Sequence, residues 1–203
     1  MLFNPKCARV ILKTVGVAVV IFLGITASSS FAEPSANVVR AYATSGSPQA
    51  GDACQPLFAA MGRNLTTPYH TYMTMTGGSA QNGKARNTET ISIGETTYVL
   101  ANGKWISNPV SAEDKKEAEE ELRKMTKAGT CQYVRDESVN GENAALFATH
   151  NKTEIGTHDN QIWVSKSKGL IVKQETDIDT GAGRPKSHVS ARYEYSNIQA
   201  PKM

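Results

Sequence analysis

The chain has 203 residues, 39% of them hydrophobic, with 22 lysines and arginines against 19 aspartates and glutamates. Three of the basic side chains, Lys6, Arg9 and Lys13, stand at the very start, and the remaining sequence carries equal numbers of acidic and basic residues. A nucleic-acid-binding protein needs a surplus of cations to displace counterions from phosphates, so this composition argues against a nucleic-acid partner.

The N-terminus has the pattern of a secretory signal peptide. Its basic start is followed by an uncharged apolar run at residues 15–25, and Ala32 closes a small-residue Ser-Phe-Ala cleavage site. The run is too short for a membrane anchor, which needs roughly 20 apolar residues. We therefore predict a signal peptide over residues 1–32, export to the periplasm or beyond, and no stable membrane span after processing.

Residues 33–51 are rich in Ala, Ser, Pro and Gly without a hydrophobic period, which predicts a flexible arm before a single domain over residues 52–203. That domain holds two cysteines, Cys54 and Cys131. In an exported chain such an even pair indicates one structural disulfide. The alternative, a redox pair, is typical of Cys-x-x-Cys, and these two cysteines are far apart.

The first helix is predicted just after the arm. Cys54, Leu57, Phe58 and Met61 recur at helical spacing and form one apolar face, and Gly62 or Asn64 would end the helix. Short strands are then predicted at residues 69–76, 86–93, 96–101 and 104–107. The last two flank Asn102-Gly103, a strong hairpin signal.

A second, highly charged helix is predicted to begin at Ser111 and to stop at Gly129. Ser111 and Asp114 form a start that resembles a capping box. The apolar side chains of this helix form only a narrow stripe, made by Ala118, Leu122 and Met125. The helix should therefore cover another element with one thin face and expose the rest to solvent.

The remainder of the chain reads as a meander of strands at 131–139, 143–150, 160–165, 169–178 and 189–196. Asn140-Gly141 turns the first pair, Lys166 to Gly169 turns the second, and the last strand alternates strictly between apolar and polar residues. The predicted fold is α+β, with eight or nine antiparallel strands. They would form a curved sheet or half-open barrel with two helices packed on the concave side.

Motifs that would indicate a reaction are scarce. Four histidines are scattered without metal-ligand spacing, with His158 in a polar loop, and the chain lacks the nucleophile, phosphate-loop and dinucleotide motifs. We predict a protein without cofactor, metal site or catalytic residues. An uncharacterised hydrolase remains an alternative, because acid–base pairs meet in space rather than in sequence.

Aromatic and apolar side chains on the strands and the charged helix have two interpretations. They pack a filled core between sheet and helices, or they line a hydrophobic cleft that the helices only partly cover. The cavity candidates are Tyr98, Trp105, Leu122, Met125, Trp163, Tyr193 and Tyr195. In the hairpin at residues 160–178, Ile162 and Val164 share one face and Trp163 points to the other, so only one of these faces can line a cavity.

Three C-terminal segments, GENAALFATH, QIWVSKSKGLIVKQETD and ARYEYSNIQAP, resemble in their order the periplasmic lipoprotein-carrier superfamily of LolA/LppX/RseB-like half-barrels. The resemblance covers residues 141–201 at the level of motifs. It implies a half-open antiparallel barrel whose helices form a lid over an apolar cavity that receives acyl chains.

These observations favour an exported, non-enzymatic protein that binds a hydrophobic ligand in a sheet cavity. That ligand would be an acyl chain, a lipid or a lipidated protein. A module for protein–protein interaction or envelope-stress sensing, without a small ligand, is the main alternative. The two hypotheses differ in whether the interior of the sheet receives a ligand or is filled by side chains.

Overall fold

The computed structural model describes residues 53–78, 84–128, 130–153, 156–181, 183 and 185–203. The predicted signal peptide, the cleavage site at Ala32 and the N-terminal arm lie outside the described residues. Those boundaries, and the start of the domain at residue 52, remain predictions.

The described residues form two helices and nine strands. In chain order they are α2 (Gln55–Asn64), β1 (Tyr69–Gly77), β2 (Arg86–Ile93), β3 (Thr96–Ala101), β4 (Lys104–Pro109), α3 (Ala112–Ala128), β5 (Cys131–Val139), β6 (Glu142–Thr153), β7 (Gly156–Ser165), β8 (Ile171–Asp179) and β9 (Ser187–Glu194). None of these helices is both long and apolar enough to cross a membrane.

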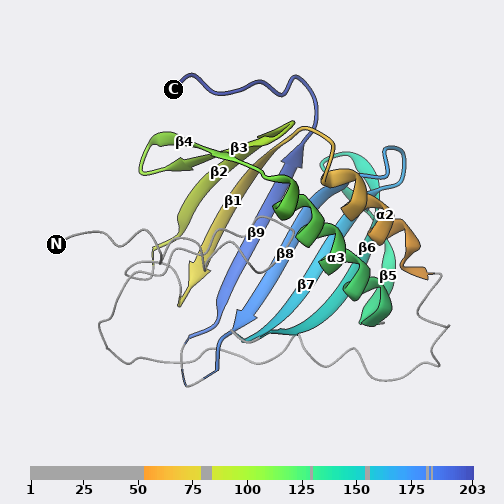
Figure 1. Ribbon diagram of the computed structural model, residues 1–203. Helices are drawn as coiled ribbons and strands as arrows, with labels where there is room; N and C mark the ends of the chain where they lie inside the picture. Colours follow the sequence, from red (N-terminus) through yellow and green to blue (C-terminus); the bar gives the residue numbers. More distant parts are fainter. Residues whose placement is uncertain (1–52, 79–83, 129, 154–155, 182, 184) are drawn as a thin grey trace. The chain divides into compact units, whose positions relative to one another are not determined.

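All nine strands belong to one antiparallel sheet in the order β4-β3-β2-β1-β9-β8-β7-β6-β5 (Figure 1). Each half is a meander of hairpins, and the first and last strands, β1 and β9, pair at the centre and join the halves. Strands β4 and β5 do not pair with each other, so the sheet is open. The predicted α+β fold with an antiparallel meander is confirmed.

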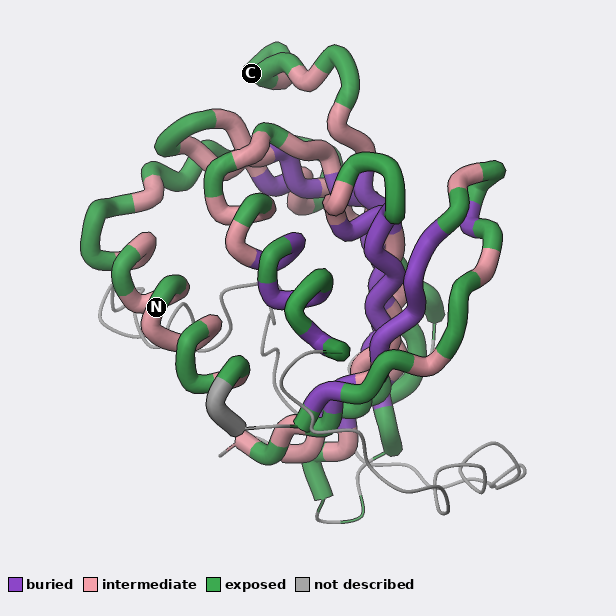
Figure 2. The backbone as a smooth tube through the Cα atoms, turned by 90° about the vertical axis from the view of Figure 1, so that its right-hand side faces the viewer, coloured by how far each residue is buried: buried purple, intermediate pink, exposed green. Residues whose placement is uncertain are grey.

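Both helices lie on the side toward which the sheet curves (Figure 2). On α2 the predicted apolar face is the buried one, because Leu57, Phe58 and Met61 are buried in the structure. The Asn-Gly sequences make the expected turns: Asn102 and Asn140 both have positive φ, as the hairpin turns require.

The register of the strands shows which side chains share the helix-covered side. Cys131 is bonded to Cys54 of α2, so the side of the sheet on which Cys131 lies faces the helices. Paired residues of an antiparallel ladder share a face. The pairing continues this inner face from Cys131 across β6, β7, β8 and β9 through Thr149, Asn160, Thr176 and Val189. We call the opposite side the outer face.

Strands β6 and β7 extend furthest beyond their predicted ranges. Strand β7 begins at Gly156 rather than at residue 160, because its polar start pairs with the equally polar end of β6, for example His158 with Asn151. His158 therefore lies in a strand and is buried, whereas the sequence placed it in a solvated loop. Burial lowers the pKa of its imidazole.

Candidate ligand-binding site

Helix α2 is fixed to the sheet at both ends. At its start, Cys54 forms the predicted disulfide with Cys131, the first residue of edge strand β5. At its end, the Arg63 guanidinium donates a 2.9 Å hydrogen bond to the carbonyl of Gly169 in the β7–β8 turn. Between these two points the helix packs on β7 and β8. The position of α2 over the inner face is thus set by a covalent bond and by a charged hydrogen bond.

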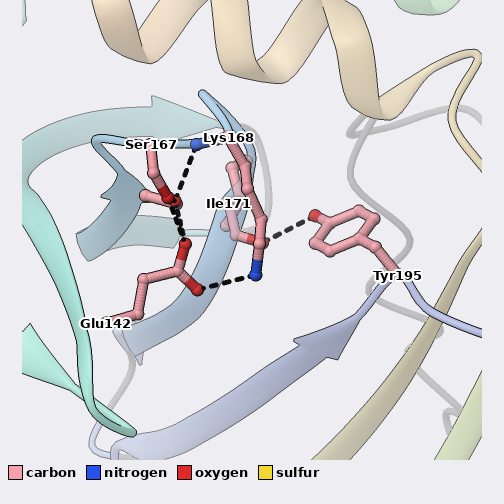
Figure 3. Close-up of polar contacts among 6 residues, drawn as sticks. Glu142, Ser167, Lys168, Ile171 and Tyr195 are labelled. Atoms are coloured by element: carbon pink, nitrogen blue, oxygen red, sulfur yellow. Dashed lines mark hydrogen bonds and ion pairs between the residues drawn. The ribbon is translucent and has the colours of Figure 1, made fainter.

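The β7–β8 turn, whose Gly169 carbonyl accepts the Arg63 hydrogen bond, is also held by Glu142 on β6 (Figure 3). One carboxylate oxygen lies 3.0 Å from the Lys168 ammonium, and the other accepts hydrogen bonds from the hydroxyls of Ser165 and Ser167. The hydrogen bond from Ser165, followed by those from the other two side chains, holds the pKa of Glu142 below its ordinary value. A polar cluster therefore fixes the turn from the side opposite to Arg63.

Tyr195, just after β9, adds a second connection at this corner of the sheet. Its hydroxyl donates a 2.6 Å hydrogen bond to the carbonyl of Ile171 (Figure 3) and lies 3.1 Å from the side-chain oxygen of Asn64, the last residue of α2. The Tyr195 phenol therefore connects three segments, which are the C-terminal end of α2, the start of β8 and the segment after β9.

Helix α3 packs chiefly on α2. Leu122 faces Gly62, where an added Cβ would lie 3.7 Å from the leucine methyl. The described part of α3 with placed side chains, residues 112–126, contains no buried residue. Its ion pair with the sheet joins Lys115 to Glu95 in the β2–β3 turn at 2.9 Å, between side chains that are 40% and 79% exposed. Such a contact contributes little to stability, so α3 is held far more weakly than α2.

A groove of about 430 Å³ lies between the two helices. Its walls are mainly apolar, and they are formed by Gln55, Phe58, Ala59, Glu119, Leu122, Arg123 and Thr126. A volume of this size is within the range of small-molecule sites, about 300–1,000 Å³. One wall belongs to the fixed helix and the other to the weakly held one.

The inner face below the helices is not uniformly apolar. A row of hydrogen-bonded side chains crosses it from β6 to β9. Tyr193 donates to Gln174 at 3.3 Å, Gln174 to Thr176 at 3.2 Å, Thr176 to Asn160 at 2.8 Å and Asn160 to Thr149 at 3.1 Å. We call these five residues the inner-face polar row. Each member satisfies its neighbour, which is how buried polar groups avoid a desolvation penalty.

Aromatic side chains gather at one end of this row. The rings of Tyr69 and Tyr193 meet edge-on at 5.7 Å between centroids, and those of Tyr193 and Tyr195 stack at 6.5 Å. Burial raises the pKa of all three phenols. The cluster therefore stays neutral over the physiological pH range.

The structure divides the predicted cavity candidates between the two faces. Tyr193 lies on the inner face, Tyr195 joins its aromatic cluster, and Leu122 lines the helix groove. Met125 is half-buried on α3 and does not line that groove. Tyr98 and Trp105 lie on the outer face, where the Trp105 ring meets His70 edge-on.

Trp163 also lies on the outer face. It pairs with Leu146 and Lys173, and it is 3% exposed in a small cluster with Val139, Ala144, Leu146, Val172 and the partly buried Val134. The Lys173 ammonium lies 4.4 Å above its ring, and its indole nitrogen donates to Glu137. The hairpin at residues 160–178 therefore presents Ile162, not Trp163, to the helices, and Trp163 stabilises the scaffold.

Several residues of the site were not selected from the sequence. The sequence assigns Phe58 only to a packing face, and it marks Thr149 and Thr176 only as strand residues. The sequence offers one signal for the inner-face polar row, which is a threonine at a strand position where an apolar residue is expected. Alternation separates the two faces of a strand, but it does not say which face the helices cover. Among the described residues, no group of three histidine, cysteine or acidic side chains lies close enough to hold a metal ion.

No family model and no curated protein sequence matches the chain. Among solved structures, it is similar to lipoprotein LppX of Mycobacterium tuberculosis, with 8% identity, a TM-score of 0.43, and coverage of 71% of this chain and 95% of that one. LprF of Mycobacterium bovis matches with 11% identity, a TM-score of 0.38, and coverage of 75% and 95%.

MucB, solved in complex with the periplasmic part of MucA, matches with 13% identity and a TM-score of 0.37. The match covers 74% of this chain and 57% of MucB. The likeness to these structures concerns the fold alone. Identities this low transfer no residue role to the present chain.

Proposed function

We propose that the protein is an exported, non-enzymatic carrier that binds an acyl chain, from a lipid or a lipidated protein, on the helix-covered side of its sheet. The groove between α2 and α3 is the observation that carries this proposal. Its lining includes the apolar residues Phe58, Ala59 and Leu122, and its volume is about 430 Å³. Burying apolar chain there would gain roughly 0.8 kcal/mol for each CH₂ group.

The unequal attachment of the two helices suggests how a ligand would enter. Helix α2 cannot leave the sheet without breaking the disulfide or the Arg63 hydrogen bond. Helix α3 is held to the β2–β3 turn by an exposed ion pair and to α2 by a narrow apolar stripe. Movement of α3 away from α2 would therefore widen the groove at low cost. We expect α3 to act as the lid and α2 to act as a fixed wall.

Lipid uptake by the exported protein tests the proposal. The chain is purified after export, its N-terminus is checked by mass spectrometry against cleavage after Ala32, and bound lipid is removed. We expect a fluorescent fatty acid to bind with micromolar or better affinity. Leu122→Gln should weaken this binding severalfold, because it places an amide in the apolar centre of the groove.

The matched control is Lys116→Gln, which introduces the same side chain at an exposed position of the same helix. It should leave the affinity unchanged. Absence of binding to the unaltered protein across several fatty acids and phospholipids would contradict the proposal. If the two variants lose affinity equally, the ligand does not bind in the groove.

A further inference from the structure

Two buried hydroxyls on the inner face have no hydrogen-bond partner. Thr71 on β1 and Thr90 on β2 are 3% and 1% exposed, and their Oγ1 atoms are fully buried and unpaired. The two residues are register partners, so they lie side by side. Thr71 also pairs with Tyr193, which places both hydroxyls on the inner face, beyond the end of the inner-face polar row.

The contrast with that row makes this pair unusual. Thr149 and Thr176 are equally buried threonines on the same face, and each is satisfied by Asn160. A buried hydroxyl without a partner destabilises the folded protein, whereas a valine of the same shape would not. A fold that provides partners for two threonines and leaves an adjacent pair unsatisfied keeps two hydroxyls that a ligand group would satisfy once the side chains covering them move apart.

The surroundings define the chemistry of that group. The register and alternation place Met73, Val99 and Tyr193 next to the two threonines on the inner face, and none of these side chains is charged. A charged headgroup would lose its hydration there without gaining a counter-ion. A neutral acceptor on an apolar chain would gain two donors at no such cost, and an ester carbonyl is such an acceptor.

We propose that Thr71 and Thr90 bind the ester carbonyl of an acyl chain, so that the inner face distinguishes acyl esters from other apolar chains. This inference rests on the proposed function, since it places the polar end of the same ligand. The ester can come from a glycerolipid or from the acylated cysteine of a lipidated protein. Both present the same carbonyl on the same kind of chain.

The test compares ligands that differ only in that carbonyl. A monoacylglycerol and its monoalkyl ether analogue compete with the fluorescent fatty acid for the delipidated protein. A second pair, a cysteinyl peptide carrying two acyl esters and its ether analogue, distinguishes the two sources. We expect the ester to bind about threefold to tenfold more tightly than the ether for each hydroxyl engaged.

The variant Thr71→Val/Thr90→Val keeps the branched shape and removes both hydroxyls. We expect it to lose the preference for the ester and to keep its affinity for the ether. Thr74→Val changes an exposed residue of the same strand on the outer face, and the preference should persist in it. Without ligand, the double variant should be as stable as the unaltered protein or more stable, because it removes an unpaired polar group.

The outcomes separate this inference from the function on which it rests. Binding of both ligands with equal affinity to the unaltered protein would overturn the ester site and leave the lipid-binding function standing. A preference that survives in the double variant, or a lower melting temperature of that variant, would also overturn the ester site. If neither ligand pair binds at all, the proposed function fails together with the ester site.

Discussion

Helices α2 and α3 lie on the same side of the sheet, yet they are held there in different ways. Helix α2 buries Leu57, Phe58, Ala60 and Met61 and is tied down at both ends. Helix α3 is longer and has no buried residue over 112–126. The amphipathic pattern of a helix therefore predicts which side faces the protein. How firmly the helix is held depends on contacts at its ends.

The difference follows from what each helix offers to its neighbours. In α2, small and apolar residues allow close approach, and Arg63 reaches a backbone carbonyl that a turn presents to it. In α3, one narrow stripe faces α2, and the remaining positions are mostly lysine, arginine and glutamate, whose exposed ion pairs contribute little. One firmly held helix and one weakly held helix are the physical result.

Of the changes that test how the two helices are held, loss of the disulfide should lower the free energy of unfolding most. Replacing Cys54 and Cys131 by serine frees the start of α2 and releases a long loop in the unfolded chain. We expect the free energy of unfolding to fall by about 2–5 kcal/mol, measured by chemical denaturation. The unaltered protein under reducing conditions should behave like the double variant. If both keep full stability, the disulfide does not hold α2.

Gly169→Ala tests the other end of α2 with a smaller effect. Gly169 has a φ of +64°, and an added Cβ would lie 2.0 Å from the Arg63 guanidinium nitrogen. The positive φ costs about 1–2 kcal/mol, and loss of the Arg63 hydrogen bond adds about 1 kcal/mol. Chemical denaturation should show a decrease in the free energy of unfolding equal to the sum of these two contributions.

Gly94→Ala is the matched control for this substitution, because Gly94 has a φ of +61° and open space around its Cα. Gly94→Ala should therefore lower the free energy of unfolding only by the cost of placing alanine at a positive φ. In an Arg63→Ala background, Gly169→Ala should cost no more than Gly94→Ala does. A difference between the two alanine variants that persists without Arg63 would mean that another contact holds the turn.

Glu95→Gln should have the smallest effect, because it acts on the lid. The Lys115 side chain lowers the pKa of Glu95, but both side chains are largely exposed. We therefore expect an unchanged melting temperature at neutral pH. A decrease as large as that of Gly94→Ala would show that α3 is fixed to the strands in the same way as α2, and the comparison of the two helices would fail.

Much of the fold could be predicted from local pattern. The helical spacing of Leu57, Phe58 and Met61, the cap at Ser111 and the two Asn-Gly turns each depend on residues close in sequence, and the structure contains all of them. In the cap, the Ser111 hydroxyl accepts a 3.1 Å hydrogen bond from the Asp114 backbone, as the spacing predicted. The disulfide followed from the compartment and from an even number of cysteines.

The site was predicted less well, because it depends on which face of each strand is covered. Alternation showed that Ile162 and Trp163 point to opposite sides, but it could not say which side the helices occupy. Likewise, Tyr98 and Trp105 have the composition of a cavity wall and lie on the outer face. Of the cavity candidates, Leu122 lines the helix groove together with Phe58, and Tyr193 and Tyr195 belong to the aromatic cluster; their contact with a ligand stays a prediction.

By itself, the sequence determined the elements, their order, the disulfide and the antiparallel meander, because these depend on spacing and turn residues that act over a few positions. Only the tertiary structure decided that β1 pairs with β9, that α2 is fixed while α3 is not, and that Thr71 and Thr90 meet without a partner. Those features arise from contacts between residues far apart in the chain, and neither composition nor periodicity encodes which distant groups will share a face.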